Sequence, residues 1–138
     1  MSAASTFFDT NVLLYMLSND LVKAGRAEIT VAMGGVISVQ VLNEFVSVAR
    51  RTFKLSWPEI ADALAPIHAV CRVVPLTREC HDIAVILAAR YVIHIYDAMI
   101  VAAAISAGCS VLQTEDLQHG QLFARRLRVN NPFLPAHA

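Results

Sequence analysis

The alternation of short strand-like runs with longer segments of helical period constrains the fold of this chain more than any other feature. Segments with apolar residues at helical spacing separate the strand-like runs, and this order is typical of strand–helix–strand units with parallel strands. We therefore expect an α/β domain with a mainly parallel central sheet of four or five strands. The runs that read as strands are residues 5–9 (STFFD), 36–38 (VIS), 71–76 (CRVVPL), 110–114 (SVLQT) and 127–131 (LRVNN).

Several of the expected helices carry a start signal. Ser38, Ser56 and Thr77 each precede a helical segment, where a side-chain oxygen can accept a hydrogen bond from a free backbone N–H group. Glu59, three residues after Ser56, completes the pattern of a capping box. The expected helices cover residues 11–18, 21–33, 39–53, 78–92 and 97–107, with another beginning after Ser56.

Size and composition limit the classes of protein to which the chain can belong. With 138 residues and no break in composition, it is expected to form one domain over residues 1–138 with a core of its own. The hydrophobic content is 57% and the mean hydropathy is +0.55. The longest uncharged stretch, residues 98–114, is nevertheless shorter than the roughly 20 apolar residues that a membrane-spanning helix needs. No basic region or long apolar segment precedes Asp9, so we expect no signal peptide and a cytoplasmic protein.

The cysteines indicate buried thiols. Cys71, Cys80 and Cys109 are odd in number, lack C-x-x-C spacing and have apolar neighbours. This pattern favours reduced, buried side chains over zinc ligands or a disulfide framework.

Carboxylates from separate parts of the chain are placed to meet at one edge of the sheet. Asp9 and Asp116 follow strand-like runs, and Glu44 lies about two turns into the helix after the second run. Asp97 stands at the front of the apolar run IYDAMIVAAA, near the expected start of its helix. Because the carboxyl ends of parallel strands share one edge, we expect these four acids to converge there. Asp97 could also serve only as a first-turn acid that stabilises its helix.

Four neighbouring carboxylates favour a metal site. Clustered like charges push one another toward protonation unless a cation neutralises them. Oxygen ligands without cysteine or histidine suit Mg²⁺, with Mn²⁺ as a possible alternative. Such an ion can activate water and stabilise charge on a phosphoryl group, so phosphodiester hydrolysis is the chemistry that this pattern indicates.

Binding to a nucleic acid would depend on local basic patches. The chain has 11 basic and 11 acidic residues and a formal net charge of zero, so it offers no overall positive field. Basic residues gather at positions 50–54 and 125–128. Arg51 lies seven residues, or about two helical turns, beyond Glu44 and should project on roughly the same face toward a bound backbone.

Four segments together resemble a known family. FFDTNVLLYML, SVQVLNEF, YDAMIVAAAISAGCSVLQTEDLQHG and LRVNNPF resemble PIN-domain ribonucleases, and more narrowly the VapC-type toxins of type II toxin–antitoxin systems. The resemblance implies a three-layer α/β/α PIN-like domain and a metal-dependent endoribonuclease that cleaves RNA. It also implies control by a cognate antitoxin protein and a homodimer.

The resemblance assigns roles by position. Asp9, Glu44, Asp97 and Asp116 correspond to the catalytic acids, and of these Asp9, Asp97 and Asp116 would hold Mg²⁺ or Mn²⁺. The supporting positions are Asn11, Thr114 and Glu115, and the substrate-binding position is Arg51. Glu115 adjoins Asp116, and the sequence leaves open whether its side chain points into the site.

Other functions remain to be compared with this one. A PIN-type nuclease could process RNA outside any toxin pair, or the fold could serve as a catalytically silent binding module. A haloacid-dehalogenase-like phosphatase would need a second aspartate where Asn11 stands, and a receiver domain would need a lysine after a late strand. For the antitoxin, we expect a groove near the first helices and the Trp57 region. The apolar residues that suggest it are Val12, Leu13, Tyr15, Met16, Leu17 and Trp57.

Overall fold

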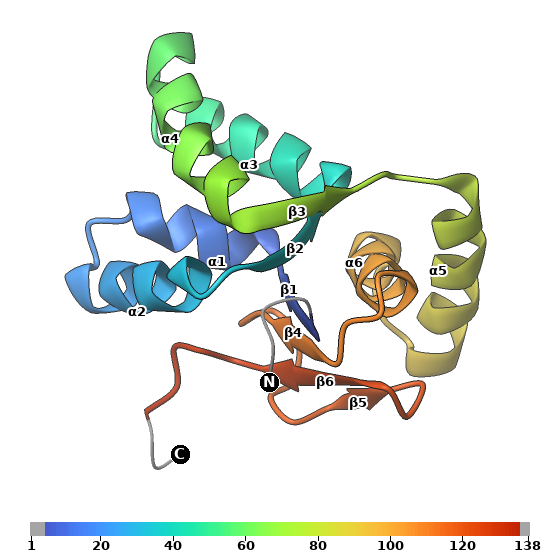
Figure 1. Ribbon diagram of the computed structural model, residues 1–138. Coiled ribbons are helices and arrows are strands. Elements are labelled where there is room, and N and C mark those ends of the chain that lie inside the picture. The colour runs from blue at the N-terminus through green and yellow to red at the C-terminus, as the bar shows by residue number, and fades with distance from the viewer. Residues whose placement is uncertain (1–4, 136–138) are drawn as a thin grey trace.

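A six-stranded sheet forms the centre of the computed structural model, which describes residues 5–135 (Figure 1). The strand order is β3-β2-β1-β4-β6-β5, and every neighbouring pair is parallel except β5 and β6. The predicted α/β class with a mainly parallel sheet is therefore confirmed. The strands are β1 (Thr6–Phe8), β2 (Gly35–Ser38), β3 (Cys71–Val74), β4 (Val111–Gln113), β5 (Leu122–Phe123) and β6 (Leu127–Asn130).

The sheet has one strand more than the sequence indicated. β5 contains only two residues, too few to show the alternation by which a strand is recognised in a sequence. It pairs antiparallel with β6, with Phe123 opposite Leu127, at one edge of the sheet. The additional strand therefore extends the expected sheet without changing its order.

Helices cover both sides of the sheet. Figure 1 shows α1 and α2 on one side and α5 and α6 on the other, with α3 and α4 near β2 and β3. This is the three-layer arrangement that was expected. The helices are α1 (Thr10–Leu14), α2 (Leu21–Ala32), α3 (Val39–Arg51), α4 (Trp57–Val70), α5 (Arg78–Tyr91) and α6 (Ile95–Ser106), and a short 3-10 helix, η2 (Tyr15–Leu17), follows α1.

The predicted helix starts are confirmed with one correction. Ser38, Ser56 and Thr77 each accept a hydrogen bond from the third backbone N–H group of their helix, and Glu59 closes the capping box. The last helix begins at Ile95 instead of residue 97, because the ring of its N-cap residue His94 accepts the N–H of residue 96. A histidine is not among the residues that usually announce an N-cap, which is why the sequence placed the start too late.

The core lies on both faces of the sheet and is densest beneath α6. Residues 98–104 are all buried, so this helix is held firmly between the sheet and α5. Phe7 and Phe8 of β1 are fully buried. Gly35 allows the close approach of Phe8, since a Cβ atom there would lie 2.7 Å from both the Phe8 ring and the Thr6 carbonyl oxygen.

The three cysteines Cys71, Cys80 and Cys109 are buried thiols, as predicted. Within residues 5–135, no single helix is both long and apolar enough to cross a membrane, although α5 and α6 pass a test of length and composition as a pair bent by 118°.

Candidate active site

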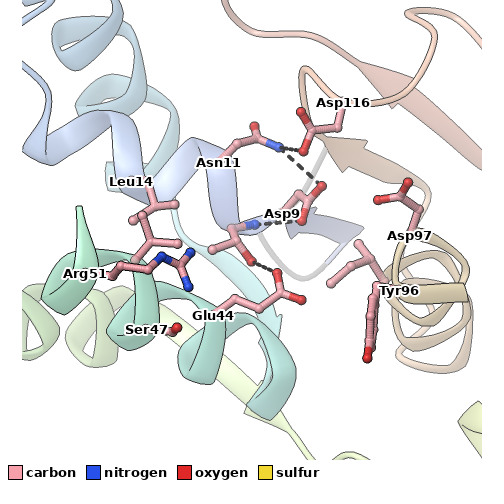
Figure 2. Close-up of a pocket in the computed structure, with 12 residues that line it drawn as sticks. Asp9, Asn11, Leu14, Glu44, Ser47, Arg51, Tyr96, Asp97 and Asp116 are labelled. Atoms are coloured by element: carbon pink, nitrogen blue, oxygen red, sulfur yellow. Dashed lines mark hydrogen bonds between the residues drawn. The ribbon is translucent and has the colours of Figure 1, made fainter. Parts of the chain in front are cut away.

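The four acids predicted to converge line one pocket (Figure 2). The pocket has a volume of about 350 Å³ and opens at the carboxyl ends of β1 and β4. Its lining also includes the predicted supporting residue Asn11 and the predicted RNA contact Arg51. The remaining lining residues are Thr10, Leu14, Ser47, Val48, Tyr96 and Ile100.

Each acid reaches the pocket from a different element. Asp9 directly follows β1 and caps α1, with Oδ1 accepting the Thr10 N–H at 2.7 Å. Asp116 comes shortly after β4, which pairs in parallel with β1 and so ends at the same edge of the sheet. Glu44 lies in the second turn of α3, and Asp97 lies in the first turn of α6. Strand ends therefore place Asp9 and Asp116, a helix start places Asp97, and Glu44 reaches the pocket from within a helix.

Asn11 and Thr114 connect the acids that follow β1 and β4. The Asn11 Nδ2 group donates to Asp9 Oδ2 at 3.3 Å, to Asp116 Oδ2 at 3.1 Å and to Thr114 Oγ1 at 3.0 Å. The fully buried Thr114 hydroxyl donates to Asp9 Oδ2 at 2.8 Å and accepts the Asp116 N–H at 3.0 Å. Both residues are thus placed to orient the carboxylates, as their predicted supporting role requires.

Glu44 is held by two residues that the sequence analysis missed. Thr10 donates through Oγ1 to Glu44 Oε2 at 2.9 Å, and Gln40 donates through Nε2 to Glu44 Oε1 at 2.9 Å. Gln40 precedes Glu44 by four residues, the spacing that brings side chains together on one helix face. That spacing was a usable signal, whereas the Thr10 contact depends on how α1 packs against α3.

Burial and the charges of neighbouring acids make Asp9 and Asp97 costly to ionise. Burial raises the pKa of Asp9 to about 7, and the charges of Asp116 and Glu44 add to this effect, while hydrogen bonds from Thr114 and Thr10 oppose it. Burial also raises the pKa of Asp97, with a further contribution from Asp116. Within residues 5–135, the ion pairs are Lys23–Glu115 and Arg78–Asp82, and neither includes an acid of the pocket. The pocket therefore holds negative charge without an ion-paired partner.

The chemistry of these donors fits a hard divalent cation. The atoms of the acids that could bind a metal ion are all carboxylate oxygens. The Asp97 carboxylate accepts no hydrogen bond from residues 5–135, so its oxygens are available to such an ion. No three His, Cys, Asp or Glu side chains of the described residues already stand as a ligand group. Mg²⁺ commonly takes only one or two protein carboxylates and keeps several waters, so it does not need a preformed group of three such ligands.

Glu115 points away from the acid pocket. Its carboxylate accepts hydrogen bonds from the Tyr15 hydroxyl and from Lys23 Nζ, the latter at 3.2 Å. It does not line the pocket, but its backbone N–H donates to Asn11 Oδ1 at 3.2 Å. Any supporting role of this residue would therefore act through the backbone, and Asp116 is the acid of the pair that faces the site.

Arg51 and Tyr96 stand at the rim. Figure 2 shows them on opposite sides of the carboxylates, Arg51 from the end of α3 and Tyr96 from the start of α6. The position of Arg51 agrees with the expected projection on the Glu44 face. Tyr96 was missed by the sequence analysis, although a large aromatic residue directly before Asp97 was a possible signal.

The expected partner surface needs correction. Val12 and Leu13 are fully buried, so they belong mainly to the core. An apolar groove of about 400 Å³ does lie between η2, α2 and α4, but Trp57 does not line it. Trp57 instead packs under Arg50, whose guanidinium carbon lies 4.7 Å from the ring centroid. The groove is lined by Leu13, Met16, Leu17, Glu28, Val31, Ala32, Phe45, Ala63, Pro66, Ile67 and Val70.

The chain is similar in sequence to one family and in fold to several solved structures. Residues 6–123 match the sequence profile of the PIN domain. A toxin–antitoxin complex from Klebsiella pneumoniae is 18% identical with a TM-score of 0.71, and the match covers 93% of this chain and 98% of that one. VapC20 from Mycobacterium tuberculosis, a sarcin–ricin loop cleaving toxin, is 21% identical with a TM-score of 0.64, covering 81% and 90% of the two chains.

A third structure is VapBC2 from Rickettsia felis bound to a DNA fragment from its promoter. It is 18% identical with a TM-score of 0.61, and the match covers 90% of this chain and 97% of that one. No curated protein sequence matches the chain significantly. At these identities, the solved structures show a shared fold.

Proposed function

The chain belongs to the PIN-domain family, and from this premise we propose that it is a metal-dependent endoribonuclease that acts as the toxin of a toxin–antitoxin pair. The observation that carries the proposal is the convergence of Asp9, Glu44, Asp97 and Asp116 in one pocket without an ion-paired cation among residues 5–135. The similar folds of a sarcin–ricin loop cleaving toxin and a toxin–antitoxin complex support it.

In this proposal, Asp9, Asp97 and Asp116 hold Mg²⁺, or alternatively Mn²⁺. Such an ion neutralises the carboxylates, activates water and stabilises charge on the phosphoryl group. Asn11 and Thr114 keep the Asp9 and Asp116 carboxylates oriented through the hydrogen bonds that join them. Supporting contacts of this kind commonly strengthen metal sites.

We propose that Glu44 takes part in proton transfer during hydrolysis. Thr10 and Gln40 each donate one hydrogen bond to it, which fixes the carboxylate while leaving acceptor capacity on both oxygens. Glu44 can therefore take up a proton released during hydrolysis. Arg51, on the same helix, is proposed to contact the phosphate backbone of the RNA at the rim.

The proposed partner is a cognate antitoxin whose apolar segment lies in the groove between η2, α2 and α4. The side chains of Met16, Leu17 and Val70 are partly exposed in the groove. No other element of residues 5–135 covers them, and exposed apolar surface of this kind marks interaction sites. We further propose that the toxin is a homodimer and acts in the cytoplasm. Light scattering of the protein alone and with its partner would contradict the dimer if both samples gave a monomer.

An RNA-processing nuclease outside a toxin pair is the nearest alternative. The acid pocket would serve both functions equally, so the geometry does not separate them. A short reading frame beside the gene, encoding a protein that binds this chain, would favour the toxin. A catalytically silent module is less well supported, because the pocket contains all four acids and their supporting contacts.

The experiment that tests the proposed activity is cleavage of structured and single-stranded RNAs by the partner-free protein. Reactions with Mg²⁺ or Mn²⁺ are compared with EDTA, and wild type is compared with Asp97→Asn. Asp62→Asn is the matched control, since Asp62 is an exposed acid on α4 outside the pocket. We expect metal-dependent cleavage that Asp97→Asn loses and Asp62→Asn keeps. No cleavage of any RNA, together with no metal binding by calorimetry, would favour the binding module.

A further inference from the structure

Tyr96 is a large aromatic side chain exposed at the rim of the acid pocket. It is 65% exposed and directly precedes Asp97 in the first turn of α6. Tyr96 is one of the residues that line the pocket with the acids, and in Figure 2 its ring and the Asp97 carboxylate leave the start of α6 in different directions. The rest of α6 buries its apolar residues against the sheet and α5, so packing of the fold does not account for this ring.

Contacts on both sides hold Tyr96 in place. Its ring stacks on the imidazole of His94, with centroids 5.1 Å apart and an angle of 28° between the planes. The Tyr96 N–H donates to His94 Nδ1 at 3.1 Å, and its carbonyl oxygen accepts from Gln40 Nε2 at 3.2 Å. Gln40 also holds Glu44, so the same side chain ties the backbone of Tyr96 to a proposed catalytic acid. Hydrogen bonds thus hold the backbone of Tyr96 on both sides, and its ring has a stacked partner in His94.

A second aromatic residue, Trp57 on α4, is also strongly exposed but has a different environment. Trp57 is 61% exposed, but Arg50 lies over its ring, so that one face already has a cation as its partner. Among the described residues, the ring contact of Tyr96 is with His94, and Tyr96 lines the same pocket as the carboxylates. An exposed aromatic ring beside a reaction centre is suited to binding a planar group.

We propose that Tyr96 stacks on an unpaired nucleobase of the RNA next to the phosphate that is cleaved. This inference rests on the proposed ribonuclease function and names a substrate-binding residue for it. Aromatic side chains stack on bases that are splayed out of a single strand or loop. In a continuous duplex, each base is already stacked between its neighbours and the ring has no base to meet.

The position of Tyr96 fits the rest of the site. Arg51, on the opposite side of the carboxylates, is placed for the phosphate backbone, while Tyr96 is placed for a base. A strand that crosses the pocket between these residues brings a phosphodiester bond over the acids. His94 supports the face of the ring that is turned away from the base, which keeps the ring from rotating out of position.

The test is RNA binding by the full chain in which Asp116→Asn blocks cleavage. The probe is a short fluorescein-labelled RNA of mixed sequence, used as a single strand and as a duplex with its complement, with Mg²⁺ present. Tyr96→Phe preserves the aromatic ring, Tyr96→Leu preserves only apolar bulk, and Trp57→Leu is the matched control for an exposed aromatic. Circular dichroism and melting temperature verify that each variant is folded.

We expect Tyr96→Leu to raise the Kd for the single strand by about 10-fold, whereas Tyr96→Phe and Trp57→Leu leave it near the parent value. Binding to the duplex should be weaker and insensitive to all three substitutions. Equal binding by Tyr96→Leu and Tyr96→Phe, or no binding of the single strand by the parent, would overturn the proposal.

Cleavage and partner assays separate the remaining outcomes. If wild type cleaves RNA but Tyr96→Leu binds the single strand normally, the stacking proposal fails while the proposed ribonuclease function stands. If wild type cleaves no RNA with Mg²⁺ or Mn²⁺, the ribonuclease function fails. If Tyr96→Leu weakens binding of an antitoxin peptide and leaves RNA binding unchanged, the ring belongs to a protein interface and the stacking proposal is wrong.

Discussion

Asp116 and Glu115 are neighbours in the sequence but lie in opposite electrostatic surroundings. The Asp116 carboxylate joins the acid pocket, where Asn11 supplies a neutral hydrogen bond. The Glu115 carboxylate lies against Lys23 and Tyr15, which supply a cation at 3.2 Å and a hydroxyl donor. The two regions therefore contain the same functional group with and without a neutralising charge.

The cluster of Glu115, Lys23 and Tyr15 is complete in itself. Lys23 Nζ donates to both other side chains and lies 4.6 Å from the Tyr15 ring centroid. Hydrogen bonding to Glu115 raises the pKa of Tyr15, and hydrogen bonds to Tyr15 and then Glu115 raise the pKa of Lys23. Tyr15 thus stays neutral and Lys23 stays charged at neutral pH, and the cluster needs no further cation.

The acid pocket has the opposite property. The pKa of Asp9 is raised to about 7 because burial and neighbouring acids disfavour its charged form. A group in this condition is stabilised by any cation that reaches it. The comparison teaches that unbalanced charge, and not the mere presence of acids, distinguishes a candidate site from a structural cluster.

The largest expected effect is on catalysis and tests the comparison directly. Asp116→Asn should lower the rate of RNA cleavage by at least about 100-fold, as removal of one preorganised electrostatic contact commonly does. Glu115→Gln should leave the rate within about fivefold of wild type, because a partly exposed ion pair contributes little. Single-turnover cleavage of one RNA by both variants measures this. Equal losses in the two variants would show that the regions are not functionally distinct.

The second prediction concerns stability without metal. Because the folded pKa of Asp9 is about 7 against an ordinary value of 3.8, the folded state binds its proton more tightly than the unfolded state does. The contribution of Asp9 to stability is therefore full below pH 3.8 and is lost as the pH rises toward about 7. In EDTA at neutral pH, Asp9→Asn should be about 1–2 kcal/mol more stable than wild type.

Urea unfolding at acidic and neutral pH measures this difference. The stabilising effect of Asp9→Asn should shrink at the acidic end, where wild-type Asp9 is protonated. Addition of Mg²⁺ should raise the melting temperature of wild type and have less effect on Asp9→Asn, because the substitution removes a proposed ligand. A variant that is less stable than wild type at neutral pH in EDTA would contradict the unbalanced charge in the pocket.

A smaller effect is expected at the rim. Arg51→Ala should weaken binding to single-stranded RNA and reduce the slope of log K against log salt concentration by about 0.7, the value for one phosphate contact. Arg90→Ala is the control, since Arg90 is exposed on α5 and lies outside the pocket and both basic patches. Titrations at several salt concentrations measure both slopes. An unchanged slope for Arg51→Ala would refute its assignment as a backbone contact.

The smallest effect is expected in the neutralised cluster. Tyr15→Phe removes the hydroxyl that donates to Glu115 but keeps the ring that packs against Phe133, with centroids 4.5 Å apart. Because Lys23 still pairs with Glu115, the loss should be about 1 kcal/mol or less of unfolding free energy, with cleavage unchanged. Urea unfolding and the cleavage assay together measure it. A large loss of cleavage would mean that the cluster acts on the site through the Glu115 backbone and Asn11.

Much of the fold could be predicted because its signals are local. Ser38, Ser56 and Thr77 act on backbone groups within a few residues, so their sequence positions are enough to place three helix starts. The five longer strand-like runs were recognised by their apolar residues. The two-residue β5 and the His94 cap were missed, since the first is too short to show a period and the second uses a ring nitrogen.

The sequence by itself determined most of the elements that form and placed Asp9, Asp97 and Asp116 at their ends, because both follow from short-range order along the chain. Only the tertiary structure decided which acid is neutralised. Lys23 lies 92 residues from Glu115, and Tyr15 lies 100 residues from it, so their contacts arise from the packing of η2 and α2 beside the end of β4. Adjacent side chains can face different surroundings, and a charge that arrives from such a distance leaves no mark in the local sequence.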